Sequence, residues 1–319
     1  MAPQLIVNTD IPSSPARTRP AERPPLRLGL VQERWRADPE AHRDALATGI
    51  RMAAGEGARI VCLQELTFSR YFATTPEGPH PGGAEPEDLA SGPTVSFAAE
   101  MAIETGVWVH ASLFERADEG DGRGYNTAVI VAPDGRLVQR TRKLHIPITA
   151  GYSEDKYFRQ GPASEAGGPF PLISLPLSDG AAAQAQLGAP TCWDQWFPEL
   201  ARAYSLAGAE VLIYPTAIGS EPDHPAFDTQ PLWQQVIVGN GVANGTFMVA
   251  INRTGVEEPL TFYGSSFISD PYGRILVQAP RSEPAVLVAD LDLDQRRDWL
   301  ELFPFLTTRR PDAYGTLVR

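Results

Sequence analysis

The sequence predicts an α/β protein in which helices cover mixed β-sheets. From Leu26 onward, short apolar runs with strand character alternate with longer segments of helical periodicity, as in layered α/β folds. In the second half, a few strand-like runs follow one another directly, which indicates sheets with mixed strand directions. With 319 residues, 43% of them hydrophobic, the chain is long enough to bury a large core. Because no internal repeat or linker divides it, we expect one domain over residues 26–319.

The individual elements follow from apolar runs bounded by Gly, Pro and polar residues. In the first half, strands are predicted at residues 26–32, 59–64, 107–115, 126–132 and 137–140. The helices between them are predicted at residues 39–55 and 94–105. In the second half, strands are predicted at residues 184–190, 211–215, 247–252, 264–269 and 286–291. The helices there are predicted at residues 198–207 and 232–243.

Residues 1–25 differ from the rest of the chain in composition. They contain six prolines among Ser, Thr and Arg residues, and such a segment lacks the apolar residues that a core requires. We therefore expect an arm or a flexible N-terminal tail that precedes the domain.

Charge and cysteine content exclude several classes of function. The formal charge of -12 disfavours a phosphate-binding surface and nucleic acid partners, and it makes a cationic or neutral substrate easier to admit than an anionic one. Two cysteines, with no cluster of Cys and His, indicate neither a disulfide framework nor a metal site. No apolar run has the length of a membrane span, and no signal peptide is evident. These features predict a cytoplasmic protein.

Three residues at predicted strand ends are candidates for catalysis. Cys192 lies in the stretch Leu-Gly-Ala-Pro-Thr-Cys-Trp-Asp-Gln-Trp-Phe-Pro-Glu at 187–199, between a strand and a helix that begins with proline. Glu65 directly follows the apolar strand at 59–64, and Lys143 lies just past the strand at 137–140. Taken singly, each has a structural explanation: a buried cysteine, a surface or capping glutamate, and a solvated basic cluster. Cys62, inside a strand, is interpreted as a packing residue.

Together these residues lie in motifs that resemble the nitrilase, or carbon-nitrogen hydrolase, superfamily. The resemblance covers about residues 26–314 and is closest to the branch that hydrolyses N-carbamoylputrescine. Its motifs are Leu-Gln-Glu-Leu at 63–66, Arg-Lys-Leu-His-Ile-Pro at 142–147, Cys-Trp-Asp-Gln-Trp-Phe-Pro-Glu at 192–199 and Tyr-Pro-Thr-Ala-Ile-Gly-Ser-Glu-Pro at 214–222. The family fold is a four-layer αββα sandwich with mixed sheets, and its subunits pair. The resemblance therefore implies this fold and a homodimer or larger assembly.

The resemblance also implies roles for individual residues. Cys192 would be the nucleophile, Glu65 the general base, and Lys143 would hold the oxyanion together with the backbone N–H of Trp193. Glu154 matches a second family glutamate, although Asp155 stands where the family often has a lysine. No metal or organic cofactor is implied.

Substrate choice follows from the residues around the nucleophile. Relatives that act on N-carbamoyl amino acids carry arginines shortly after the cysteine, whereas this chain has Trp-Asp-Gln-Trp at 193–196. Glu221 matches an acid that meets the distal ammonium of carbamoylputrescine, and an ordinary loop glutamate is the alternative. The resemblance places Tyr71, Thr216 and Ala217 in the substrate site as well, and residues 223–228 are positioned to reshape it.

The resulting hypothesis is a cofactor-free thiol amidohydrolase that acts on an N-carbamoyl amine through a thioester. It would convert N-carbamoylputrescine into putrescine, carbon dioxide and ammonia, a step of polyamine biosynthesis. The first alternative is a related hydrolase of another amide, an N-carbamoyl amino acid or a nitrile, in specialised metabolism. The second is a binding protein on the same scaffold.

Overall fold

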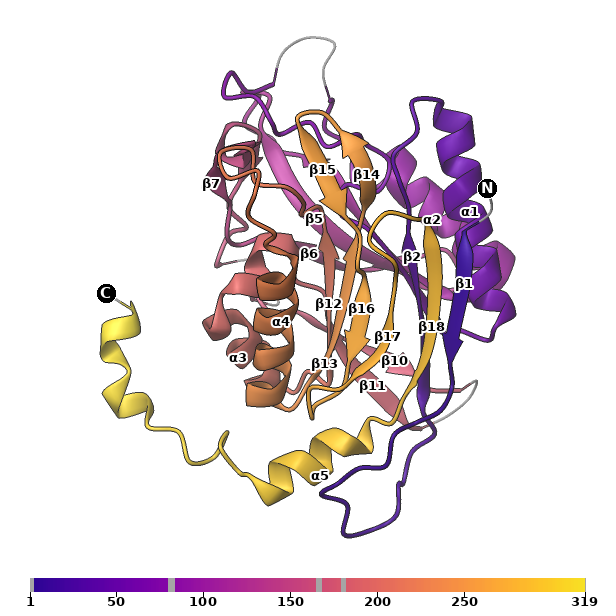
Figure 1. Cartoon of the computed structure of the whole chain (residues 1–319), viewed down its shortest axis with the longest axis vertical. Helices are drawn as coiled ribbons and strands as arrows, with labels where there is room; N and C mark the ends of the chain where they lie inside the picture. Colours follow the sequence, from indigo (N-terminus) through magenta and orange to yellow (C-terminus); the bar gives the residue numbers. More distant parts are fainter. Residues whose placement is uncertain (1–2, 80–83, 165–167, 179–181, 319) are drawn as a thin grey trace.

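The computed structural model describes residues 3–79, 84–164, 168–178 and 182–318. Within these residues, two β-sheets lie face to face, and pairs of helices cover their outer faces (Figure 1). This arrangement confirms the predicted four-layer αββα sandwich with mixed sheets. None of the helices in the described ranges has the length and apolar character needed to cross a membrane.

The first sheet has the described strands in the order β1-β18-β2-β3-β4-β5-β6, with β9 beside β5. Their bounds are Gln4–Asn8 (β1), Leu26–Gln32 (β2), Ile60–Leu63 (β3), Trp108–Arg116 (β4), Gly124–Val131 (β5), Leu137–Arg142 (β6), Phe158–Arg159 (β9) and Ala285–Leu291 (β18). Helices α1 (Pro39–Gly55) and α2 (Pro93–Thr105) pack on its outer face, where Ile50 and Met101 join the same apolar cluster as Val61.

The second sheet has the order β10-β11-β12-β13-β16-β17 among the described residues. Its strands are Leu172–Pro176 (β10), Gln184–Gly188 (β11), Val211–Thr216 (β12), Phe247–Asn252 (β13), Phe267–Ser269 (β16) and Ile275–Gln278 (β17). Helices α3 (Pro198–Leu206) and α4 (Gln230–Asn244) cover its outer face through a cluster that contains Tyr204, Trp233 and Met248.

The core between the sheets is built from the inner faces of both. Leu30 and Ile130 of the first sheet share one apolar cluster with Leu187 and Ile213 of the second. Cys62 belongs to the same cluster and is fully buried, and burial raises the pKa of its thiol. This location agrees with the packing role predicted for Cys62.

Several boundaries follow from local chemistry. Helix α1 begins at Pro39, as predicted, because the Asp38 side chain accepts the backbone N–H groups of Glu40 and Ala41 and Pro39 suits the first helical position. Helix α2 ends at Thr105 and is followed by Gly106, whose φ of 71° suits a residue without a β-carbon. Three predicted strands are shorter in the structure, since β3 covers only Ile60–Leu63, β11 ends at Gly188 and β16 begins at Phe267.

Some elements were not predicted. They are the hairpins β7 (Ile148–Thr149) with β8 (Tyr152–Ser153) and β14 (Thr254–Glu257) with β15 (Leu260–Tyr263), the strands β1, β9, β10 and β17, and the helix α5 (Asp294–Leu302). Most of them are short or strongly polar, so they have too few apolar residues to produce a recognisable period.

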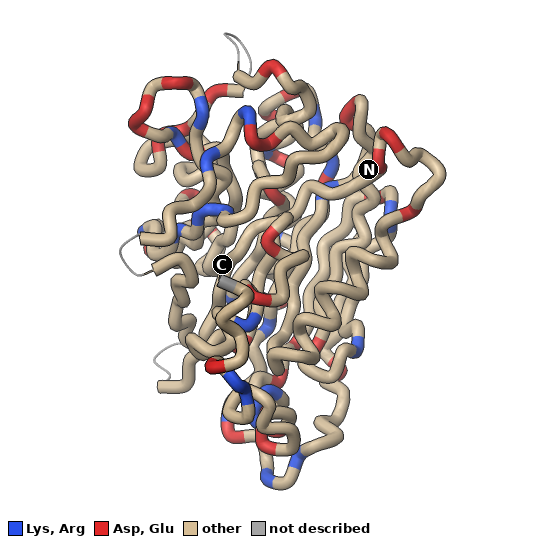
Figure 2. Tube along the Cα trace, turned by 90° about the vertical axis from the view of Figure 1, so that its left-hand side faces the viewer, with Lys and Arg blue, Asp and Glu red and all other residues tan. Residues whose placement is uncertain are grey.

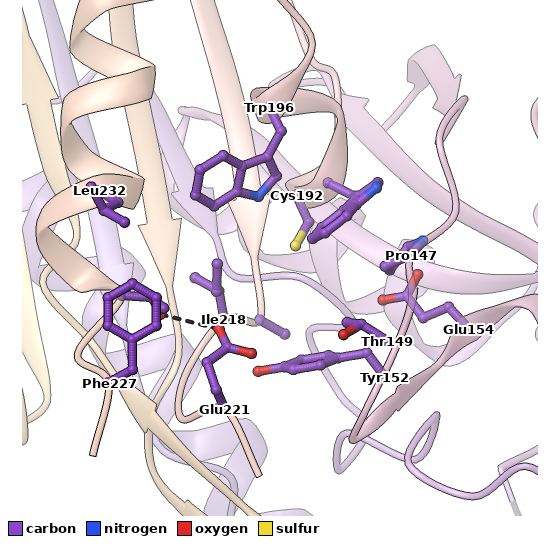
Figure 3. Close-up of a pocket in the computed structure, with 13 residues that line it drawn as sticks. Pro147, Thr149, Tyr152, Glu154, Cys192, Trp196, Ile218, Glu221, Phe227 and Leu232 are labelled. Carbon is purple, nitrogen blue, oxygen red and sulfur yellow. Dashed lines mark hydrogen bonds between the residues drawn. The ribbon is translucent and has the colours of Figure 1, made fainter. Parts of the chain in front are cut away.

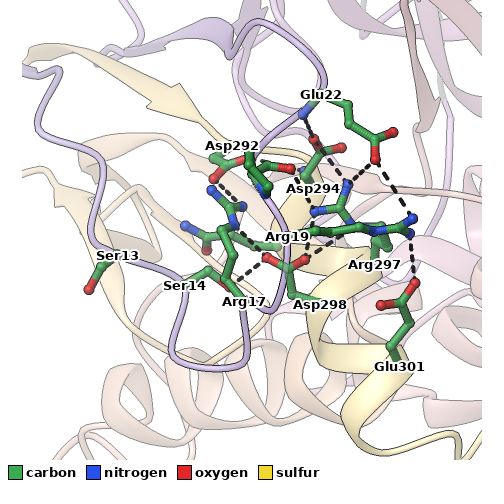
Figure 4. Close-up of polar contacts among 12 residues, drawn as sticks. Ser13, Ser14, Arg17, Arg19, Glu22, Asp292, Asp294, Arg297, Asp298 and Glu301 are labelled. Atoms are coloured by element: carbon green, nitrogen blue, oxygen red, sulfur yellow. Dashed lines mark hydrogen bonds and ion pairs between the residues drawn. The ribbon is translucent and has the colours of Figure 1, made fainter.

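The N-terminal segment packs against the domain, in contrast to the flexible tail expected from its composition. Strand β1 pairs in parallel with β18, and Arg17 forms ion pairs with Asp292 at 2.6 Å and Asp298 at 2.8 Å (Figure 4). Arg23 similarly reaches Asp294. Basic and acidic residues gather at the end of the molecule where α5 lies (Figures 1 and 2). Backbone pairing and charge therefore anchor a segment that contributes few core residues; Met1 and Ala2 lie outside the described residues.

This anchoring predicts a difference between two arginine variants. Arg17→Gln is expected to lower the free energy of unfolding by about 1–3 kcal/mol, because it removes the charge-assisted hydrogen bonds that Arg17 donates to the buried Asp298 and Asp292. Arg19→Gln removes the exposed pair with Glu301 and should cost less than about 1 kcal/mol. Denaturant unfolding of both variants beside the parent measures the two costs.

The Arg17 effect should depend on pH. Burial acts to raise the pKa of Asp298, but hydrogen bonds from Arg17, Ser14 and Arg297 outweigh it and hold that pKa below the usual value of 3.8. A carboxylate with a depressed pKa stabilises the fold at higher pH and loses that contribution as pH falls through its folded pKa. The cost of Arg17→Gln should therefore shrink in acid; a cost that grows there would contradict this assignment.

Candidate active site

Three buried ionic groups meet where strands of the first sheet end. Glu65 follows β3 and Lys143 follows β6, while Glu154 opens a short 3-10 helix, η1 (Glu154–Lys156). Lys143 Nζ lies 3.0 Å from Glu65 Oε1 and 2.7 Å from Glu154 Oε2. All three residues are at most 1% exposed, so the structure brings together the three ionisable candidates predicted from the first half of the sequence.

The charges of this cluster control its protonation. Burial acts to lower the pKa of Lys143, but the adjacent Glu154 and Glu65 outweigh it and raise that pKa, so the ammonium persists at neutral pH. Burial is also the largest influence on Glu154, and with the charge of Glu65 it raises the Glu154 pKa against the opposing effect of Lys143. Tyr71 Oη donates to Glu154 Oε1 at 2.8 Å, whereas Lys143 donates to the other carboxylate oxygen, Oε2.

Cys192 lies on a tight turn between β11 and α3. The sequence predicts a strand that leads directly into a helix, but a separate 3-10 helix, η2 (Cys192–Trp196), precedes α3, which begins at Pro198. Cys192 has a φ of 42°, a left-handed conformation that residues with a β-carbon rarely adopt. Such a conformation persists only when its surroundings hold it in place.

Asp194 provides part of that support. Its carboxylate accepts the backbone N–H of Thr191 at 3.2 Å and forms a capping box with that residue. The same carboxylate accepts the backbone N–H of His145 at 3.0 Å and contacts His145 Nδ1 at 2.8 Å. The loop after Lys143 is therefore tied directly to the turn that carries Cys192, and His145 contributes to this link.

The environment of Cys192 keeps its thiol protonated. Burial raises the pKa of the thiol, and the charge of Glu65 raises it further, whereas Lys143 and a backbone hydrogen bond from Ala217 act in the opposite direction. Glu65 Oε1 is held by Lys143 Nζ and by Asn126 Nδ2 at 2.7 Å. In the described ranges, no hydrogen bond partner reaches the buried Glu65 Oε2. One carboxylate oxygen is thus free to accept a proton.

Cys192 opens into a cavity of about 310 Å³ between the two sheets' loop ends (Figure 3). Its wall is mainly aromatic and aliphatic, with Trp196 and Ile218 among the lining residues. Glu154 and Glu221 also line it, and the described part of its wall includes no Lys or Arg. An apolar cavity with few polar groups beside a buried nucleophilic atom is typical of a small-molecule site.

Not all predicted substrate residues face this cavity. Trp193, Ala217 and Glu221 do line it. Tyr71 instead lies behind Glu154, and Thr216 donates to the carbonyl of Tyr214 at 3.1 Å; neither is among the described lining residues. Thr216 is the last residue of β12, where neighbouring side chains alternate between faces, so motif membership alone did not fix its direction.

Two supporting residues had no predicted role. Arg253 is fully buried, and its Nη2 donates to the carbonyls of Glu65, Leu66 and Ser69 at 2.8, 3.0 and 3.0 Å. Asn252 accepts the backbone N–H of Ile218 and donates to its carbonyl. The available signal was the polar pair Asn252-Arg253 at the end of the apolar run 247–251, because such a pair indicates the rim of a sheet.

Comparison with known proteins identifies the class. The family model described as carbon-nitrogen hydrolase matches residues 27–301. The chain therefore belongs to the carbon-nitrogen hydrolase family, whose members are enzymes that cleave non-peptide carbon-nitrogen bonds.

Individual members of that family are similar to this chain over most of its length. The chain is 37% identical over 277 residues to an N-carbamoylputrescine amidase of Arabidopsis thaliana, an alignment that covers 84% of this chain and 87% of the relative. It is 35% identical over 302 residues to a citrullinase of Francisella tularensis, covering 92% and 98%. A carbon-nitrogen hydrolase structure from Helicobacter pylori G27 superposes with a TM-score of 0.76 at 30% identity, over 92% of this chain and 99% of that one.

Proposed function

We propose that the protein hydrolyses N-carbamoyl amines whose other end carries a cationic amine, with N-carbamoylputrescine as the representative substrate. The observation that carries this proposal is the position of Glu221 in the wall of the cavity that contains Cys192. A carboxylate in an apolar wall without Lys or Arg among its described residues favours an ammonium group over a carboxylate. The amidase relatives support the same substrate class.

Catalysis begins with proton transfer from the Cys192 thiol to Glu65. The resulting thiolate attacks the carbamoyl carbon, and the negative charge that develops on the carbonyl oxygen is stabilised by Lys143 Nζ and the backbone N–H of Trp193. Lys143 has three N–H donors, so it can contact this oxygen while it remains paired with Glu65 and Glu154. Glu65 then returns the proton to the amine, which leaves as the carbon-nitrogen bond breaks.

The second half of the reaction releases the carbamoyl group from sulfur. Glu65 accepts a proton from a water molecule, which attacks the thioester carbon, and the carbon-sulfur bond breaks as the thiol is regenerated. The product, carbamate, decomposes to carbon dioxide and ammonia. Glu154, held by Tyr71, keeps Lys143 cationic throughout.

Glu221 is oriented for substrate recognition by its neighbours. Thr229 Oγ1 donates to Glu221 Oε1 at 3.1 Å, which leaves the other carboxylate oxygen for an ammonium group. An N-carbamoyl amino acid would instead bring a carboxylate into this wall, where like charges repel.

Citrulline is a second candidate because of the citrullinase relative. Its α-ammonium suits Glu221, but its α-carboxylate has no cationic partner in the described cavity wall. We therefore propose that citrulline is a poorer substrate than N-carbamoylputrescine.

An ammonia-release assay over N-carbamoylputrescine, citrulline, N-carbamoyl-β-alanine, simple amides and nitriles tests the proposal, with Cys192→Ala as the inactive control. N-carbamoylputrescine is expected to have the highest kcat/KM and to release carbon dioxide with ammonia. If N-carbamoyl-β-alanine, which has a carboxylate and no ammonium, is preferred by about tenfold or more, roughly 1.4 kcal/mol, the role given to Glu221 is wrong.

A substitution isolates the contribution of Glu221. Glu221→Gln is expected to raise KM for N-carbamoylputrescine roughly 10- to 100-fold, because a hydrogen bond to a charged group contributes about 1.5–3 kcal/mol. KM for neutral N-carbamoylbutylamine should change much less. Glu199→Gln, in the exposed first turn of α3, is the matched control. Equal effects of Glu221→Gln on both substrates would remove its assigned role.

A further inference from the structure

The loop from 217 to 229, between β12 and α4, forms one side of the cavity. Residues 223–228 are exposed, unlike the buried strand before them. Phe227 nevertheless lines the cavity while its residue remains 54% exposed. Its ring is therefore a thin wall, with the cavity on one side and solvent on the other, and it contributes little to the core.

Cys192 and Phe227 line different ends of the cavity. In Figure 3, Phe227 and Leu232 lie on the side of Glu221 that is away from Cys192 and Glu154. The Tyr152 ring lies between these ends, and its hydroxyl points toward Glu221 (Figure 3). A substrate with its carbamoyl group at Cys192 and its ammonium at Glu221 would thus have its ammonium end directed toward Phe227.

The loop fixes Phe227 relative to Glu221. The carbonyl of Glu221 accepts the N–H of His224 at 2.9 Å, and the carbonyl of His224 accepts the N–H of Phe227 at 2.8 Å. The next residue, Asp228, accepts two 2.8 Å hydrogen bonds from Arg281, and the Thr229 hydroxyl donates a hydrogen bond to the Glu221 carboxylate. The acid and the aromatic wall therefore belong to one hydrogen-bonded unit with a set spacing.

We propose that Phe227 determines the length of the diamine that the site accepts. The inference rests on the proposed function and adds a residue that selects among carbamoylated α,ω-diamines. A substrate longer than the distance from Cys192 to Glu221 must place its ammonium beyond the Glu221 carboxylate and against the apolar Phe227 ring. There the ammonium would lose its hydrating water and gain no polar partner, which is unfavourable. Removal of the ring would connect the cavity to solvent, where a longer chain could keep its ammonium hydrated.

The dependence of kcat/KM on the length of the diamine, here called the length profile, tests this role. We would measure kcat/KM for the N-carbamoyl derivatives of 1,3-diaminopropane, putrescine, cadaverine and 1,6-diaminohexane. In Phe227→Ala, the ratio of kcat/KM for the six-carbon to the four-carbon substrate should rise at least about tenfold, the lower end of what one methylene decides in an apolar pocket. Phe227→Trp, which enlarges the wall, should move the ratio in the opposite direction.

Phe303→Ala is the matched control. Phe303 is similarly exposed, at 51%, but lies beyond α5 and is not among the lining residues, so its replacement should leave the length profile unchanged. Thermal unfolding of each variant verifies folding, and Phe227→Trp tests the inference even if Phe227→Ala does not fold.

The possible failures are distinguishable. If the parent enzyme releases ammonia from carbamoyl diamines but both Phe227 variants keep its length profile, the inference is overturned and the proposed function stands. A uniform loss of kcat/KM at every length would also overturn it, since Phe227 would then act as a general cover. If the parent hydrolyses no carbamoyl diamine, the proposed function and the inference about Phe227 are both wrong.

Discussion

Glu65→Gln is expected to lower kcat by roughly 10²- to 10⁴-fold, the range that a positioned general base contributes. The amide keeps the shape of the side chain and can still contact Asn126 and Lys143, but it cannot accept the proton of Cys192. Because burial raises the pKa of that thiol, little thiolate forms at neutral pH without the base.

The same variant should react slowly with a neutral thiol reagent such as a haloacetamide. Labelling of Cys192 at about pH 7 is expected to slow because the amide cannot accept the thiol proton, and this loss should outweigh the removal of the Glu65 charge, which acts to raise the pKa of the thiol. Cys62, fully buried between the sheets, should remain unlabelled in the folded protein. Glu100→Gln, an exposed substitution on α2, is the control. If Glu65→Gln kept more than a tenth of the parent activity, Glu65 would not be the base.

The second large effect is expected from Lys143→Met. It removes the cation between Glu65 and Glu154 and leaves two neighbouring carboxylates in a buried cluster. Breaking a buried ion pair in this way costs about 3–5 kcal/mol of stability. The loss of an oxyanion donor should also lower kcat by about 10²- to 10³-fold.

The stability loss of Lys143→Met should have a characteristic pH dependence. Burial and Glu65 already raise the pKa of Glu154, and removal of Lys143 raises it further. A group with a raised pKa binds its proton more tightly in the folded state, so the fold loses stability as pH rises above the usual glutamate pKa of 4.5. The variant should therefore be closer to the parent in stability at about pH 5 than at about pH 8.

A double variant separates structure from chemistry. Lys143→Met with Glu154→Gln removes one of the two facing carboxylates, so it should recover much of the lost stability at neutral pH. It should not recover activity, because the oxyanion donor is still absent. Recovery of activity in the double variant would show that Lys143 acts only as a counterion.

The sequence was most informative where apolar strands end in polar residues. Glu65, Lys143 and Cys192 could be selected because each interrupts or follows a strand, and the family motifs fixed their order. Helix α1 was predictable for a similar reason, since its ends are set by local residues.

Features that depend on distant contacts were not predictable. Arg253 reaches the carbonyl of Glu65 across 188 positions, so no local period could reveal it. Strand β1 is ordered by β18 at the opposite end of the chain, and composition alone therefore indicated a flexible tail. The direction of Tyr71 toward Glu154 likewise depends on residues 83 positions apart.

The loop between β12 and α4 carries both Glu221 and Phe227, whereas Glu65 and Lys143 follow strands of the first sheet and Glu154 follows β8. Under the proposed function, selectivity and acid-base chemistry thus have separate sources in the chain. A protein built this way could acquire a new substrate by exchanging one surface segment, without disturbing the ionic cluster beside Cys192. The scaffold is therefore a practical starting point for redesign by loop grafting.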